Sequence, residues 1–389
     1  MASKQTKHEG YEFDRDLAEK LVDLESQRGI RFSPDGKRIV YSAGRFHNVR
    51  KGKNYVSSLW LASSTEAGSA RQLTSGAFAD SSPQWHPDGN RILFYSDRSE
   101  PGKKRGIWAL RLDGGDPTAI TPVDCEKGIE CWQLSPDGRT LAYASADEKA
   151  KDEKKDDDLD DPEVWGEKWE YARLRLVDLE TKETKVLVSG DRHISALHWS
   201  PDGKEIAFES EENTENEEPL ITGSSFAVVN VESGAVRELC TEKVGSFGLK
   251  WAPDGKLYLV IVAPAGKTCG GFAVAAINPA EESPSLNRVA YGEQDDVLDV
   301  VLSGGKVLVE RLTRFTTIVS EVGGGDLFTL PDTAILAWDV FFDQETGNPS
   351  LATSTSTVDS PQDTFIFTNS GKDKLQLQVT ARLILMPST

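Results

Sequence analysis

Apolar and polar residues alternate in short segments, and one tight turn recurs before them. The turn is a Pro-Asp-Gly motif, found at residues 33–36, 86–89, 135–138, 200–203 and 252–255. Proline presets the backbone of a β-turn, aspartate can hydrogen-bond within the turn, and glycine takes its last position. A large apolar residue precedes each turn, and strict alternation follows the first four. That alternation has the period of a half-buried strand, so each copy predicts a β-hairpin.

A second pair of short segments follows each of the first four hairpins. These pairs are 59–62 with 71–74, 107–110 with 118–121, 174–177 with 185–188, and 226–229 with 236–239. Four strands in a repeat of about 40–50 residues are typical of a β-propeller blade. Degenerate hairpins at 302–309 and 338–356 complete the count. The sequence therefore predicts an all-β, seven-bladed β-propeller.

The chain divides into three predicted regions. Residues 1–26 form an extension with a short helix over Asp14–Leu24, because Leu17, Leu21 and Leu24 recur at helical spacing. Residues 27–380 form the propeller, and residues 381–389 form a tail that does not continue the repeat.

One long insertion separates the third and fourth turns. Residues 147–161 are almost entirely Asp, Glu, Lys and Ala, a composition that cannot bury enough apolar surface to order itself. The following segment, 162–171, places three aromatic residues among carboxylates. It predicts either a ligand contact or the packing of an irregular strand. A second acidic stretch, 209–218, is expected to be solvated.

Net charge and targeting signals limit the partners and the cellular location that the sequence predicts. The formal net charge of −19 disfavours nucleic acid and anionic membranes, since both are bound through Lys and Arg. No apolar run follows Met1, and no window approaches the ~18 apolar residues of a membrane span. Four cysteines without close pairing indicate reduced thiols. We therefore predict a cytoplasmic protein.

The sequence contains no recognisable catalytic centre. A nucleophile elbow of the GxSxG type is missing, and the nearest string, 223–226, lacks the second glycine. None of the five histidines lies beyond His198, and none is clustered with other metal ligands. We predict no catalytic residue, no cofactor and no metal site, although carboxylates inside a propeller channel could still act as a catalytic pair.

The repeats resemble a known peptidase family. The five turns, Gln72-Leu73-Thr74, the entry segment 16–37 and the segment 164–171 are similar to TolB-like propellers and to the prolyl oligopeptidase family of serine peptidases. The closest likeness is to its acylaminoacyl-peptidase and dipeptidyl-peptidase branch. The resemblance implies a propeller that covers an active site and admits only peptides. In the family an α/β-hydrolase domain carrying Ser, Asp and His follows the propeller, whereas nine residues follow Thr380 here, so no catalytic residue carries over.

Two functional hypotheses follow from this resemblance. One is a substrate-gating propeller of an intracellular serine peptidase, inactive alone because its catalytic domain is missing. The other is a non-enzymatic, TolB-like propeller that binds a protein or peptide. Under the first, the predicted contacts to a cationic peptide N-terminus are Glu163, Glu167, Trp169 and Glu170. Neither hypothesis fixes the oligomeric state, or whether the chain is a truncated or a genuine short product.

Overall fold

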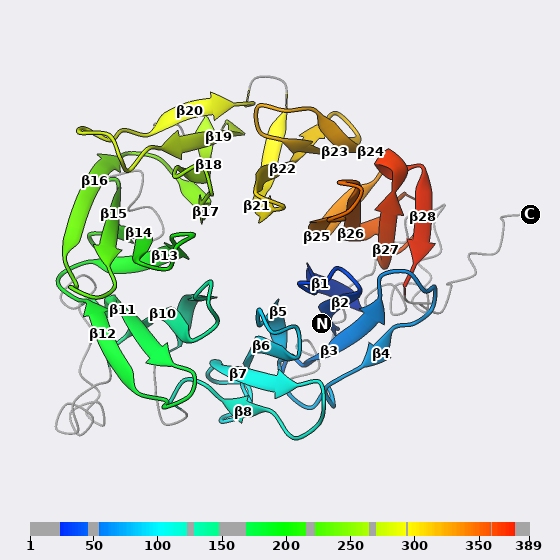
Figure 1. Cartoon of the computed structure of the whole chain (residues 1–389), viewed down its shortest axis with the longest axis horizontal. Coiled ribbons are helices and arrows are strands. Elements are labelled where there is room, and N and C mark those ends of the chain that lie inside the picture. The colour runs from blue at the N-terminus through cyan, green and yellow to red at the C-terminus, as the bar shows by residue number, and fades with distance from the viewer. Residues whose placement is uncertain are drawn as a thin grey trace, which may run out of the picture.

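Seven four-stranded antiparallel sheets surround a common axis in the part of the chain that the structure describes (Figure 1). The structure is a computed structural model, and it describes residues 24–45, 54–122, 128–147, 169–214, 222–263, 270–292, 295–358 and 360–377. Each sheet consists of four strands that are consecutive in the chain. This arrangement is the predicted seven-bladed propeller. The helix predicted over 14–24 lies outside the described residues, apart from Leu24.

The first strand of each blade lies nearest the axis and the fourth forms the outer edge. The strands of blades 1 to 4 are β1 (Ser26–Phe32), β2 (Arg38–Gly44), β3 (Ser57–Ser63), β4 (Arg71–Gln72), β5 (Ser81–Trp85), β6 (Arg91–Ser96), β7 (Gly106–Arg111), β8 (Thr118–Ala119), β9 (Ile129–Leu134), β10 (Thr140–Ala146), β11 (Ala172–Asp178), β12 (Thr184–Val188), β13 (His193–Trp199), β14 (Glu205–Glu211), β15 (Ser224–Asn230) and β16 (Val236–Glu242).

Blades 5 to 7 follow the same plan. Their elements are β17 (Ser246–Trp251), β18 (Leu257–Ala263), β19 (Gly271–Ile277), β20 (Asn287–Ala290), β21 (Asp296–Ser303), β22 (Lys306–Thr313), β23 (Thr316–Glu321), β24 (Asp326–Pro331), β25 (Ala334–Phe342), β26 (Pro349–Ser356), β27 (Asp363–Thr368), the 3₁₀ turn η1 (Asn369–Gly371) and β28 (Asp373–Gln376). The two degenerate hairpins turn at Gly304-Gly305 and at Gly347, as the sequence predicts. No helix among the described residues is long and apolar enough to cross a lipid bilayer.

The serine that precedes three of the Pro-Asp-Gly motifs closes the turn through its hydroxyl. In blade 1, Ser33 Oγ donates to Asp35 Oδ1 at 2.5 Å and accepts from the Arg38 amide at 2.9 Å. The serines at 135 and 200 make the same two bonds in blades 3 and 4. Hydrogen bonding to the serine hydroxyl lowers the pKa of Asp35. The motif is therefore a self-contained turn that each strand pair can carry unchanged.

The connections between successive strands lie alternately on the two faces of the ring. We call the face with the hairpin turns between first and second strands the turn face. The opposite face, where second strands lead to third strands and each blade leads to the next, is the loop face. The first described strand, β1, begins at the loop face, and β28 ends there.

The hydrophobic core lies between neighbouring blades. Ile194 and Trp199 on β13 pack against Leu174 and Leu176 on β11, and corresponding clusters join the other blades. The period-2 alternation places apolar side chains on both faces of a blade because each blade is covered on both sides. Burial of apolar area between blades is the main stabilising contribution.

Hydrogen bonds near the axis join one inner strand to the next. Gln133 on β9 accepts two hydrogen bonds from Trp199, one from the amide to Oε1 at 2.8 Å and one from Nε1 to the backbone carbonyl at 3.2 Å. At the ring closure Asp339 on β25 accepts from the Phe32 amide at 2.8 Å. Ring closure thus uses the same inter-blade contact as the interior of the ring, and within residues 24–377, as far as the structure describes them, no sheet takes strands from both ends of the chain.

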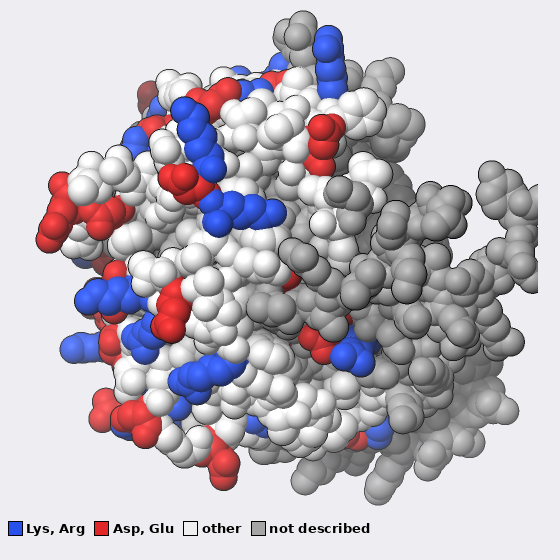
Figure 2. Space-filling model, turned by 90° about the vertical axis from the view of Figure 1, so that its right-hand side faces the viewer, with Lys and Arg blue, Asp and Glu red and all other residues white. Residues whose placement is uncertain are grey.

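The outer flank carries both signs of charge. Figure 2 shows Lys and Arg side chains interspersed with Asp and Glu on the flank that lies to the right in Figure 1. The described residues include close pairs of opposite charge, such as Lys306–Glu321. On this flank the net charge of −19 does not produce a surface of one sign.

Candidate functional site

The predicted contact residues fall at the edge of the described structure. Glu163 and Glu167 lie outside the described residues. Trp169 is half-buried and Glu170 is exposed, and both directly precede β11. The next residue, Tyr171, donates from its hydroxyl to the Glu212 carbonyl at 3.0 Å. The end of the predicted segment therefore lies beside the loop-face end of β14.

β-Bulges interrupt every inner strand near the loop face. The register shifts lie between residues 28 and 31, 81 and 84, 129 and 131, 194 and 196, 247 and 250, 297 and 299, and 335 and 337. A bulge inserts one extra residue and re-aims the side chains around it. Glu130 and Ser195 are bulge residues of this kind, and both are exposed on innermost strands.

Two buried carboxylates lie at this end of blade 4, and one of them bonds the exposed Ser195. Glu209 and Glu211 lie two residues apart on β14 and are only 3% and 7% exposed. Ser195 Oγ donates to Glu211 Oε1 at 2.8 Å, and Ser224 Oγ donates to the same oxygen at 3.5 Å. Ser246 Oγ of blade 5 donates to Glu209. Three serine hydroxyls therefore donate to the Glu209–Glu211 pair, and none of these hydrogen bonds comes from a cationic side chain.

Glu130 lies on β9 of the neighbouring blade, one residue before Cys131. Burial raises the pKa of the Cys131 thiol to about 12, and Glu130, Glu211 and Glu209 each add to that increase. Three carboxylates thus act on one thiol at the end of blades 3 and 4. We call Glu130, Glu209 and Glu211 the acidic rim.

The acidic rim holds a proton near neutral pH. Burial, and then the charge of Glu209, raise the pKa of Glu211 to about 7. Burial also raises the pKa of Glu209. Two nearby carboxylates in a buried site favour sharing a proton over double ionisation. A bound cation would reverse that preference, because it stabilises the ionised pair.

The acidic rim corrects one expectation from the sequence. The stretch 209–218 was expected to be a solvated acidic loop, but Glu209 and Glu211 are buried strand residues. The alternation of Ile206, Phe208 and Ser210 with the residues between them continues to Glu211. Glu209 faces the interface with blade 5, where the Ser246 hydroxyl compensates part of its burial.

A second set of polar residues lies further along the inner strands, nearer the turn face. Gln84, Gln133, His198 and Lys250 are partly accessible although they lie on innermost strands, so solvent reaches the ring axis. Burial, and then Lys250, lower the pKa of His198 to about 3. This imidazole is neutral at physiological pH, so it donates and accepts hydrogen bonds without adding charge.

Glu310 is the most isolated carboxyl group near the axis. It faces Asp299 across the β21–β22 ladder and is 5% exposed, and its Oε1 has no hydrogen-bond partner. Burial, and then Asp299, raise the pKa of Glu310 to about 8. Among the described residues no three His, Cys, Asp or Glu side chains are placed to hold a metal ion.

Comparisons with curated proteins find peptidases. No protein-family profile matches the chain. The chain is 27% identical over 208 residues to the uncharacterized peptidase YuxL of Bacillus subtilis. The aligned region covers 49% of this chain and 30% of that protein. It is 27% identical over 264 residues to dipeptidyl-peptidase 5 of Porphyromonas endodontalis, covering 61% and 37%. The matched regions span about a third of the length of these relatives.

Solved structures show the same fold. Acylaminoacyl peptidase of Pyrococcus horikoshii aligns with a TM-score of 0.66 at 13% identity, over 92% of this chain and 53% of that chain. The β-propeller domain of the Trilobed protease from Pyrococcus furiosus, described as having an open velcro topology, aligns with a TM-score of 0.63 at 13% identity, over 92% and 99%. These comparisons confirm that the chain resembles the propeller domains of such peptidases.

Proposed function

We propose that this chain is a substrate-gating β-propeller of a serine peptidase resembling acylaminoacyl- and dipeptidyl-peptidases, and that it binds peptides without cleaving them. The observation that carries the proposal is the buried Glu209–Glu211 pair of the acidic rim, since Glu211 accepts a hydrogen bond there from the exposed Ser195.

A peptide N-terminus has the chemistry that this rim would recognise. Its ammonium group carries a positive charge below a pKa of about 8. Glu130 is exposed and can make the first contact, and Glu211 accepts hydrogen bonds next to it. Charge-assisted hydrogen bonds of this kind are the stronger ones in proteins. The ammonium would displace the proton held by the Glu209–Glu211 pair.

Two further points support a binding role. The relatives include a dipeptidyl-peptidase and the aligned structures include an acylaminoacyl peptidase, which makes peptides the favoured ligand class. The sequence also contains no nucleophile elbow. We therefore expect neither hydrolysis of acyl-peptide or dipeptide chromogenic substrates nor labelling by a serine-directed fluorophosphonate.

The test is the affinity of a short unstructured peptide with a free N-terminus, measured by isothermal titration calorimetry. Acetylating that N-terminus should weaken binding about tenfold, the value of one charge-assisted hydrogen bond. Glu211→Gln should remove most of the difference between the two peptides. Binding of the free peptide should strengthen from pH 6 to pH 7.5, because Glu211 ionises over that range while the ammonium stays charged.

Glu345→Gln is the matched control, because Glu345 is exposed in the hairpin turn of blade 7 at the turn face. This variant should bind both peptides like the unaltered chain. Equal affinities for the free and acetylated peptides would contradict the proposed role of the acidic rim. Fluorophosphonate labelling that abolishes a measured hydrolysis would contradict the non-catalytic part.

A further inference from the structure

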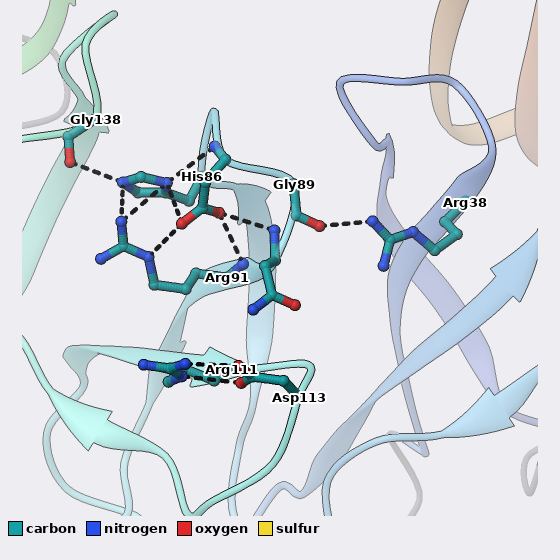
Figure 3. A network of polar contacts seen from close by, with 9 residues as sticks. Arg38, His86, Gly89, Arg91, Arg111, Asp113 and Gly138 are labelled. Atoms are coloured by element: carbon teal, nitrogen blue, oxygen red, sulfur yellow. Dashed lines mark hydrogen bonds and ion pairs between the residues drawn. The ribbon is translucent and has the colours of Figure 1, made fainter.

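The turn face carries a series of slots between neighbouring Pro-Asp-Gly turns. Slot 1–2 lies between the turns of blades 1 and 2, and Arg38 fills it. Arg38 donates to the Gly89 carbonyl at 2.6 Å, and its guanidinium lies 5.1 Å from the centre of the Trp85 ring (Figure 3). Trp85 Nε1 donates to the Arg31 carbonyl at 3.0 Å, which fixes the indole. A guanidinium is thus the natural occupant of this slot.

Slot 2–3 is also filled from within the chain. His86 Nε2 donates to the Gly138 carbonyl at 2.9 Å (Figure 3). A Cβ on Gly138 would lie 2.5 Å from that nitrogen, so the imidazole leaves no free space. Arg91 stays in its own blade, bound to Asp88 at 2.7 Å. In both slots a donor from one blade reaches the glycine carbonyl of the next turn.

Slot 3–4 has the same walls but lacks the donor. Thr140 occupies the repeat position of Arg38 and Arg91. A cavity of about 390 Å³ remains there, lined among others by Thr140, Trp199 and Gly203. Trp199 holds the position of Trp85 and donates to the Gln133 carbonyl in the same way. No hydrogen bond from the described residues reaches the Gly203 carbonyl.

Two carboxylates line the cavity as well. Asp137 and Asp202 belong to the two turns that form the slot. Hydrogen bonds from the serine hydroxyls at 135 and 200 lower the pKa of Asp137 and Asp202, respectively, so both are ionised at neutral pH. Slot 3–4 therefore combines an unused carbonyl and two negative charges with the exposed edge of Trp199, whose side chain is otherwise buried in the core.

We propose that slot 3–4 binds the side chain of an arginine presented by a partner polypeptide. The occupant of slot 1–2 is the template, since Arg38 contacts the equivalent tryptophan and the equivalent glycine carbonyl there. A planar guanidinium has several N–H donors, so it can donate to the Gly203 carbonyl and pair with the carboxylates of Asp137 and Asp202 at the same time. This site is separate from the acidic rim, which lies on the opposite face, so its test does not depend on the proposed function.

The probe is N-acetyl-arginine amide, titrated into the chain by isothermal titration calorimetry. We expect one site. N-acetyl-citrulline amide has nearly the same shape without the charge, and it should bind about tenfold more weakly. Equal binding of the two probes, or no binding of the arginine probe, would overturn the proposal.

Two substitutions test the assignment, one by filling slot 3–4 and the other by emptying slot 1–2. Thr140→Arg supplies the missing donor from within and should abolish binding of the probe. Arg38→Thr empties slot 1–2 and should create a second site of similar affinity. Near-ultraviolet circular dichroism verifies that each variant keeps the fold. Unchanged stoichiometry in a folded Thr140→Arg variant, or in a folded Arg38→Thr variant, would contradict the assignment.

Discussion

The least expected feature of this propeller is the burial of polar residues such as Glu310. Glu310 is 5% exposed and lacks a partner for Oε1. Its pKa of about 8 means that folding keeps a proton that the unfolded chain loses near pH 4.5. Between these values the folded state binds more protons, so stability falls as pH rises.

Replacing Glu310 should remove this pH dependence. We expect Glu310→Gln to be about 2–4 kcal/mol more stable than the unaltered chain at pH 9, since the amide has no charge to bury. At pH 4 the two should be nearly equal, because the carboxyl is protonated in both states. Urea unfolding at the two pH values measures the difference.

The exposed Glu345 again supplies the control for that experiment. Glu345→Gln should follow the unaltered chain within about 0.5 kcal/mol at both pH values. If Glu310→Gln lost stability between pH 4 and pH 9 as steeply as the unaltered chain, the assigned pKa shift would be wrong.

At the scale of elements, the hairpin turn decides how closely neighbouring blades approach. Gly36 and Gly255 occupy the same turn position with φ of +68° and +86°. A Cβ on Gly36 would lie 2.2 Å from the Phe341 ring, whereas a Cβ on Gly255 would have no atom within 4 Å. Phe341 in turn packs on Phe32 with ring centres 5.7 Å apart. Gly36 therefore allows blades 7 and 1 to meet.

Alanine at the two positions should separate backbone strain from inter-blade packing. Gly255→Ala should cost about 1 kcal/mol of stability, the penalty of the left-handed backbone alone. Gly36→Ala should cost about 2–3 kcal/mol, because Phe341 must move off Phe32 as well. Thermal or urea unfolding of both variants measures the gap, and equal costs would show that the seam between blades 7 and 1 tolerates displacement.

Most elements follow from the local sequence pattern. All five Pro-Asp-Gly motifs form the predicted hairpin turns, since proline, aspartate and glycine each satisfy a local requirement. The outer strands of blades 5 and 6 were harder to identify. β20, for example, is short and mostly exposed, so it lacks an alternating apolar pattern. Its place is set by pairing with β19.

The candidate site depended on information that the sequence does not hold locally. Glu209 and Glu211 read as the start of an acidic stretch, and only the pairing of β14 with β13 and β15 reveals that they are buried. The bulge that exposes Ser195 also arises from strand register. Trp169 and Glu170 were identified by composition, and the structure places the adjoining Tyr171 beside Glu212.

At the scale of the whole molecule, the two faces of the ring carry different chemistry. The loop face has the acidic rim and both ends of the described propeller. The turn face has the slots, and slot 3–4 is lined by a tryptophan and holds a cavity of about 390 Å³. Under the two proposals, the ring would hold a peptide at its loop face and an arginine of a partner at its turn face.

The central claim is that peptides bind at the acidic rim, and photo-cross-linking tests it most directly. A peptide with a free N-terminus and a benzophenone at its second residue would be irradiated with the chain, and the attachment point mapped by mass spectrometry. The account predicts attachment at the loop-face ends of blades 3 and 4, within residues 128–134, 193–197 or 207–214, and competition by unlabelled free peptide. Attachment confined to the turn face or the outer strands would contradict it.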